Sequence, residues 1–167
     1  MMGLTTIGGL PAHPLLVHLV VVLVPVSALL LVCAVCWPAA RIRLGLAPTL
    51  IALITMVTIP VTTDAGEWLE KQVPRDPLVK AHAELGDQML FWSIGVFVFA
   101  AGWWVVHSTR FARWRADRVP SSGAPRMGHS VVVVVAVLSV FVAAGSIVQV
   151  YRIGESGAKA VWGDQLG

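Results

Sequence analysis

The sequence predicts an all-α protein, an integral membrane four-helix bundle with both termini on the outer side of the membrane. The first observation is composition: of 167 residues, 57% are hydrophobic and 13% are charged, whereas soluble domains carry about a quarter charged residues. The second is a mean hydropathy of +0.80, concentrated in four long apolar segments. The third is that arginines gather in two of the loops between these segments. We therefore expect one membrane domain, residues 1–167, and no separate soluble domain.

Each apolar segment is long enough to cross about 30 Å of hydrocarbon, which takes about 20 helical residues. The expected helices span about 14–37, 44–63, 77–107 and 130–151. Pro14 is suited to a first helical position, because its missing N–H needs no partner there. The third helix is expected to begin outside the membrane at Pro77, with Asp76 as its N-cap, and to enter the apolar region at about Gln88.

The loops predict the orientation, because cytoplasmic loops are enriched in lysine and arginine. Arg41 and Arg43 follow the first segment. The loop between the third and fourth segments contains Arg110, Arg113, Arg115, Arg118 and Arg126. These two loops are expected in the cytoplasm, so the termini and the loop between the second and third segments face outward. No charge precedes Arg41, so we expect the first helix to be retained rather than cleaved as a signal peptide.

The chain is basic, with a net charge of +3 and a pI near 9.3. Cytoplasmic loops account for this excess, so nucleic-acid binding is not expected. The lipid bilayer is the expected partner. Cys33 and Cys36 lie late in the first segment and are expected to pack as small apolar side chains.

Histidines mark the outer ends of two helices. His13 and His18 lie at the mouth of the first helix, and His82 lies in the first turns of the third. His18 is expected roughly 7 Å deeper than His13, at ~1.5 Å rise per residue. An ionisable residue at that depth indicates a function, because burying it without a partner is costly. A lone histidine at a helix mouth can also be an interfacial anchor, which is our interpretation of His107 and His129 on the cytoplasmic side.

The predicted orientation gathers other polar residues on the same outer side. We expect Asp64, Glu67, His82 and Arg152 to form a polar cluster that ties the helix ends together, because such groups are costly to leave unpaired near lipid. The polar tail that follows Tyr151 is expected to lie in the outer interface, with Trp162 as its anchor.

With these residues the chain resembles a bacterial integral-membrane family known as domain of unknown function 2231. The resemblance covers nearly the whole chain. It rests on His13-Pro-Leu-Leu-Val-His18, Gly66-Glu67-Trp68-Leu69, His82 and Val150-Tyr-Arg152. It implies a multi-pass four-helix protein of the bacterial plasma membrane.

The resemblance also implies redox partners, because some members of that family are joined to Rieske or cytochrome c modules. This sequence has no Rieske ligand set and no Cys-x-x-Cys-His haem-attachment site. An electron-transfer partner would therefore be a separate chain.

The leading function class is a membrane redox module that binds b-type haem near the outer face. Four-helix bundles build cofactor sites from side chains on facing helices, and haem needs histidine or methionine ligands. We expect His18 and His82 as the ligand pair, with His13 in reserve. The residues expected to hold the haem propionates are Tyr151, Arg152 and Lys159.

Two other classes remain open. A zinc or copper site is the second, because imidazoles and carboxylates suit these ions; its expected ligands are His18, His82, His13, Asp64 and Glu67. The third is a structural or accessory subunit, with no cofactor, in a monomer or an oligomer. Independent enzymatic activity is not expected, because no serine or cysteine nucleophile has a base at a recognisable spacing.

Overall fold

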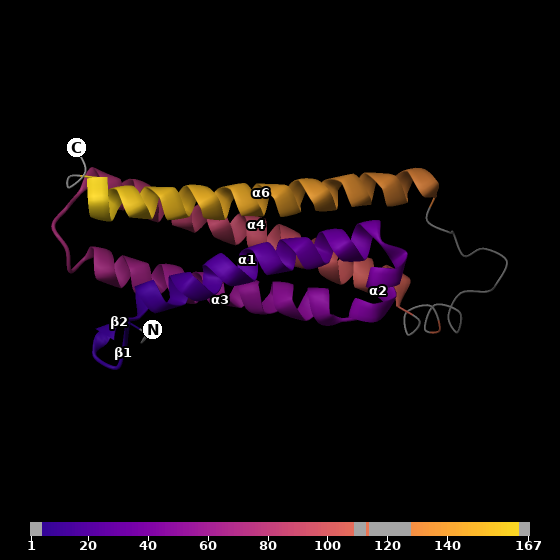
Figure 1. Ribbon diagram of the computed structural model, residues 1–167, viewed down its shortest axis with the longest axis horizontal. Coiled ribbons are helices and arrows are strands. Elements are labelled where there is room, and N and C mark those ends of the chain that lie inside the picture. Colours follow the sequence, from indigo (N-terminus) through magenta and orange to yellow (C-terminus); the bar gives the residue numbers. More distant parts are fainter. Residues whose placement is uncertain (1–4, 109–112, 114–127, 164–167) are drawn as a thin grey trace.

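Four long helices form the protein, as the computed structural model shows for residues 5–108, 113 and 128–163. They are α1 (Ala12–Cys36), α3 (Ala47–Glu70), α4 (Pro77–His107) and α6 (His129–Trp162). Each is long and apolar enough to cross a membrane, and Figure 1 shows them running side by side along the long axis. The all-α membrane-protein fold expected from the sequence is confirmed.

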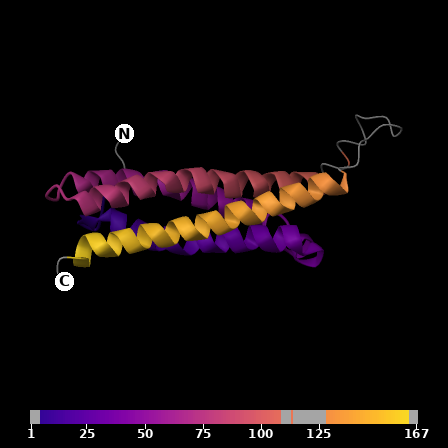
Figure 2. The ribbon, with the colours of Figure 1, turned by 90° about the horizontal axis from the view of Figure 1, so that it is seen from above.

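Two small elements complete the described chain. A hairpin of β1 (Thr6–Ile7) and β2 (Leu10–Pro11), paired antiparallel, precedes α1. A short helix, α2 (Pro38–Leu44), follows α1 and ends at Gly45, whose positive φ of 54° turns the chain toward α3. The hairpin and the end of α6 lie at one end of the bundle, and α2 lies at the other (Figures 1 and 2).

The helix bounds differ from expectation mainly where polar residues extend a helix. The helix α4 has the expected bounds, and its N-cap Asp76 accepts a hydrogen bond from the Leu78 amide at 2.7 Å. The helix α3 continues beyond residue 63 to Glu70. The helix α6 continues beyond the expected end at residue 151 and remains helical to Trp162. Its last turns pack against α4, and that packing outweighs the low helix propensity of Gly154 and Gly157.

Around the bundle, α1 packs against α3 and α6, and α4 packs against the same two helices. The helices α1 and α4 are therefore diagonal neighbours. They begin at the same end, where α3 and α6 finish (Figure 1).

The outside of the bundle is apolar, and its core is filled by small residues. Phe91 is 74% exposed and Phe141 is 64% exposed, whereas Ala28 and Ala52 are fully buried. Small core residues let helices approach closely in a bilayer, where lipid surrounds the large apolar side chains. This distribution suits a lipid-embedded bundle.

Glycines set the closest approach of α4 and α6. A methyl group at Gly145 of α6 would overlap the Trp92 ring of α4, and one at Gly95 of α4 would lie 2.8 Å from a methyl carbon of Val142. The Trp92 ring also packs against Phe91 and Phe141, with ring centres 5.8 and 6.2 Å away. The close contact between these two helices therefore depends on the absence of a side chain at Gly95 and Gly145.

At the α2 end, Trp103 joins α4 to α1. Its indole N–H donates to the Ala34 carbonyl oxygen at 3.0 Å, and the Arg41 guanidinium lies 5.8 Å from the centre of its ring. The His107 ring packs 4.5 Å from Trp103 between ring centres. These contacts hold the predicted cytoplasmic end together.

Candidate functional site

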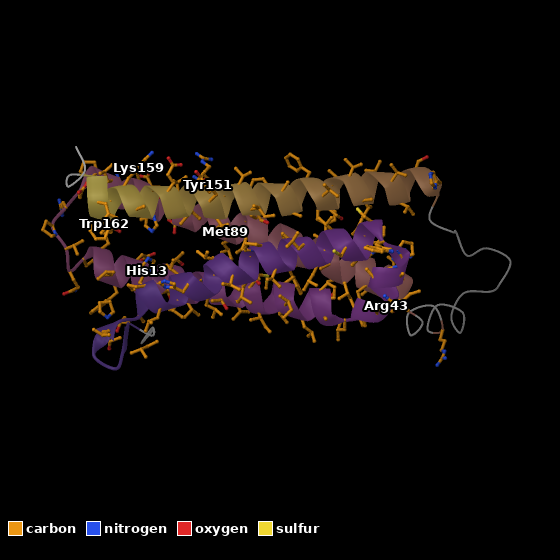
Figure 3. All side chains as sticks on the ribbon, viewed as in Figure 1. His13, Arg43, Met89, Tyr151, Lys159 and Trp162 are labelled. Carbon is orange, nitrogen blue, oxygen red and sulfur yellow. The ribbon has the colours of Figure 1, made fainter. Side chains whose placement is uncertain are left out.

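Two histidines meet inside the end of the bundle formed by the first turns of α1 and α4 and the last turns of α3 and α6. We call it the histidine end. The ring centres of His13 on α1 and His82 on α4 are 6.2 Å apart, and the rings are nearly perpendicular, at 86°. Because α1 and α4 are diagonal neighbours, the pair spans the centre of the bundle. Figure 3 shows His13 at this end and Arg43 at the opposite end.

Each ring is fixed by a backbone carbonyl of the neighbouring helix. His13 Nδ1 lies 3.0 Å from the Thr62 carbonyl oxygen of α3, and His82 Nδ1 lies 3.1 Å from the Ile153 carbonyl oxygen of α6. A carbonyl oxygen only accepts, so Nδ1 carries the proton in both rings. In a neutral imidazole the other nitrogen, Nε2, then has a free lone pair.

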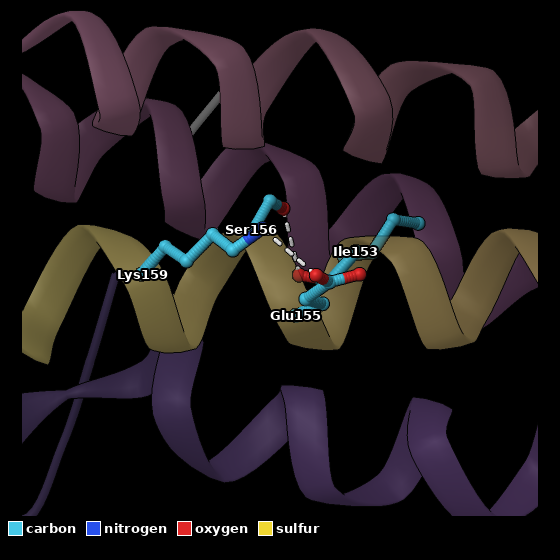
Figure 4. Close-up of polar contacts among 4 residues, drawn as sticks. All are labelled: Ile153, Glu155, Ser156 and Lys159. Carbon is cyan, nitrogen blue, oxygen red and sulfur yellow. Dashed lines mark hydrogen bonds and ion pairs between the residues drawn. The ribbon is translucent and has the colours of Figure 1, made fainter. Parts of the chain in front are cut away.

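Ser156 supports the His82 contact. Its hydroxyl oxygen lies 3.0 Å from His82 Nδ1 and donates to the Ile153 carbonyl oxygen at 2.8 Å, the bond drawn in Figure 4. The Nδ1–H of His82 is therefore shared between two acceptors, which fixes the orientation of the ring.

A glycine one turn after each carbonyl acceptor makes room for the ring. A Cβ at Gly66, four residues after Thr62, would lie 2.9 Å from His13 Nδ1 and Cε1. A Cβ at Gly157, four residues after Ile153, would lie 3.1 Å from His82 Cε1. The helices α3 and α6 thus present the same pair of features, an acceptor and a glycine, to the two histidines.

The electrostatic setting favours a neutral His82 ring. His82 lies in the first turns of α4, together with Lys80, Glu84 and Asp87 and outside the apolar part of the helix. Burial lowers the pKa of its imidazole, and the neighbouring His13 lowers it further, against the opposing effect of the hydrogen bond to Ile153. A neutral imidazole with one fixed N–H is the usual state of a metal-ligating histidine.

The structure pairs His82 with His13 rather than with His18. His18 is exposed, and its Nδ1 bonds to the Pro14 carbonyl oxygen of its own helix. Five residues turn an α-helix by roughly 140° beyond one full turn, so His18 faces outward when His13 faces inward. It also lies roughly 7 Å further along the helix, away from the level of His82.

The other predicted site residues lie on the surface. Tyr151 is 70% exposed, Arg152 is exposed, and Lys159 forms an exposed ion pair with Glu155 at 2.8 Å, shown in Figure 4. In Figure 3 the Tyr151 and Lys159 side chains project from the outer side of α6.

The predicted polar cluster is not formed. Asp64 and Glu67 are exposed, and the ion pairs among the described residues are two exposed i, i+4 contacts, Lys80–Glu84 and Lys159–Glu155. The carboxylates of Asp64 and Glu67 lie on the exposed side of α3 rather than toward the centre of the bundle. Within residues 5–108, 113 and 128–163, no three histidine, cysteine, aspartate or glutamate side chains are placed to share a metal ion. Cys33 and Cys36 are free thiols on the exposed surface of α1.

Four apolar helices and a half-buried histidine pair define an integral membrane protein with a polar site at one end of its bundle. The family model described as "Predicted membrane protein (DUF2231)" matches residues 9–167. The chain belongs to this family of membrane proteins, as the resemblance implied. No curated protein and no solved structure matches the chain.

Proposed function

We propose that the protein is a redox module of the bacterial plasma membrane that binds one b-type haem at the histidine end, through His13 and His82. The separation of the two rings carries this proposal. Metal–nitrogen bonds of about 2 Å, and about 1.2 Å from each ring centre to Nε2, put two imidazoles on opposite sides of one metal about 6.4 Å apart between centres. The ring centres here are 6.2 Å apart.

The donor set suits haem iron, which accepts histidine nitrogens as axial ligands. Both histidines have Nδ1 bonded to a carbonyl, so Nε2 is the nitrogen available to a metal. Haem supplies one-electron transfer when bound. The hydrogen bonds from Nδ1 to the Thr62 and Ile153 carbonyls orient the two rings.

Of the residues proposed for the propionates, Arg152 is now the leading one. Lys159 is paired with Glu155, and Tyr151 points outward. Arg152 has no ion pair among the described residues, so its guanidinium is available to a carboxylate.

The second proposal is a zinc or copper ion at the same two histidines, because the same Nε2 atoms would serve as ligands. Two imidazoles are fewer than the three or four protein ligands usual for zinc. The histidine pair alone therefore suits haem iron, with its four porphyrin nitrogens, better than it suits a bare ion.

The absorption spectrum and the metal content of the purified protein distinguish the haem, metal and structural functions. Protein purified from haem-replete cells should show a Soret band and an α-band that appears on reduction, at about one haem per chain. A colourless preparation with one zinc or copper per chain would replace haem with the metal site. Folded protein with neither group would leave the structural or accessory role.

Gly157→Ala should lower the haem content several-fold without removing a ligand, because its Cβ would press on the His82 ring. Gly154→Ala is the matched control, since a Cβ at Gly154 of the same helix meets nothing within 4 Å. Haem per folded chain is the measurement. Equal content in both variants would mean that the position of the ring is unimportant.

We also propose that the histidine end faces the outer side of the membrane, because the arginines near α2 mark the opposite end as cytoplasmic. In a chain with Cys33 and Cys36 replaced by alanine, Glu70→Cys should react with a membrane-impermeant maleimide in intact spheroplasts. Arg43→Cys, at the opposite end, should react only after permeabilisation. The reverse pattern would contradict the orientation and place the site on the cytoplasmic side.

A further inference from the structure

A small cavity lies in the middle of the bundle, away from the histidine end. Its volume is about 10 Å³, close to the smallest volume that holds one water molecule. Each long helix contributes one residue with a hydroxyl group to its wall: Ser27 from α1, Thr55 from α3, Ser93 from α4 and Ser146 from α6. All four residues are buried. A ring of hydroxyls at the centre of a membrane bundle requires an explanation, because alanine would pack there without polar cost.

The hydroxyl protons on the α4 and α6 side are already used within their own helices. Ser93 donates to the Leu90 carbonyl oxygen and Ser146 donates to the Ala143 carbonyl oxygen, both at 2.8 Å. A hydroxyl has one proton and two lone pairs. The lone pairs on these two oxygens therefore remain available to accept hydrogen bonds.

The hydroxyls on the α1 and α3 side are joined to each other. The oxygens of Ser27 and Thr55 are 2.6 Å apart. Ser27 Oγ also lies 2.6 Å from the Leu23 carbonyl oxygen, and Thr55 Oγ1 lies 2.8 Å from the Ile51 carbonyl oxygen. One of the two hydroxyls donates to the other, and the second donates to a backbone carbonyl, so both protons have a partner. Each of the four helices thus places a residue with a hydroxyl group at the cavity wall.

We propose that this cavity binds one water molecule, which donates hydrogen bonds to hydroxyls of different helices. A water needs two to four polar partners and about this volume. A metal cation would also suit oxygen lone pairs, but no carboxylate lines the cavity, and an uncompensated charge in the centre of a membrane is costly. The bound water links α1, α3, α4 and α6 at one level and fixes their register. It does not depend on the histidine pair.

A direct test is a high-resolution structure of the full chain in a lipid nanodisc. A single peak of density is expected in the cavity, within hydrogen-bond distance of at least two of the four hydroxyl oxygens. An empty cavity, in a map that resolves other ordered waters, would overturn the proposal. Density with the short distances and higher coordination of a metal ion would overturn it as well.

A matched pair of variants tests the same point without a structure. Ser146→Ala removes an acceptor from the cavity. Ser139→Ala removes an equally buried hydroxyl of α6, which donates to the Val135 carbonyl oxygen at 2.7 Å and does not line the cavity. The thermal midpoint should fall by about 3 °C more for Ser146→Ala than for Ser139→Ala, the shift expected for about 1 kcal/mol in a chain of this size. Equal shifts would contradict a bound water.

Discussion

Replacing His13 with alanine should remove haem from the protein, and replacing His82 should do the same. Each substitution deletes one of the two axial ligands that we propose and would leave the haem held by a single histidine, which weakens its binding. His18→Ala should leave the haem content near that of the unmodified protein, because His18 is exposed and bonds to its own helix. We expect at least a tenfold difference in haem per folded chain between the His13 and His18 variants.

The control for folding is His13→Gln, which keeps a hydrogen-bond donor of similar size near the Thr62 carbonyl. If His13 only ties α1 to α3, glutamine should restore both the thermal midpoint and the haem content, since such a membrane hydrogen bond is worth only ~1 kcal/mol. If His13 is a ligand, glutamine should restore the midpoint and not the haem. Loss of haem in His18→Ala together with full content in His13→Ala would restore the His18–His82 pair favoured by the sequence.

The choice between His13 and His18 depends on how α1 is rotated about its own axis, that is, on which of its faces turns toward the bundle. The sequence does not determine this rotation. Their depth along the helix gave a partial signal. With ~1.5 Å rise per residue, His18 is expected more than 10 Å deeper than His82, whereas His13 is expected only about 7 Å deeper than His82. Depth therefore favours His13. The sequence interpretation gave more weight to the cost of burying His18, but an exposed His18 that bonds to its own Pro14 carbonyl avoids that cost.

The membrane fold was predictable because the length and composition of an apolar segment dominate its choice of environment. The positions of the histidine rings were not predictable, because they depend on contacts between helices. Gly66 and Gly157 carry no local signal that distinguishes them from other glycines, and their role follows only from the rings that lie on them. The same contacts explain the helical tail of α6, where packing overrides the weak propensity of Gly154 and Gly157.

A second large effect is expected from Gly145→Ala at the contact between α4 and α6. The new methyl group would overlap the six-membered ring of Trp92, and the neighbouring Phe91 and Phe141 restrict where that ring can go. Either the helices separate or the indole swings out and leaves its contact. Overpacking of this kind costs about 1–3 kcal/mol, so the thermal midpoint should fall by roughly 3–10 °C.

Gly154→Ala on the same helix is the control, and it should raise the midpoint slightly, because it gains up to about 1 kcal/mol of helix propensity and meets no neighbour within 4 Å. Adding Trp92→Leu to Gly145→Ala should recover part of the loss, since the shorter side chain makes room for the methyl group. The double-mutant cycle then measures the coupling between the two positions. Purely additive effects, or a midpoint that rises in Gly145→Ala as it does in Gly154→Ala, would mean that α4 and α6 do not pack through this glycine.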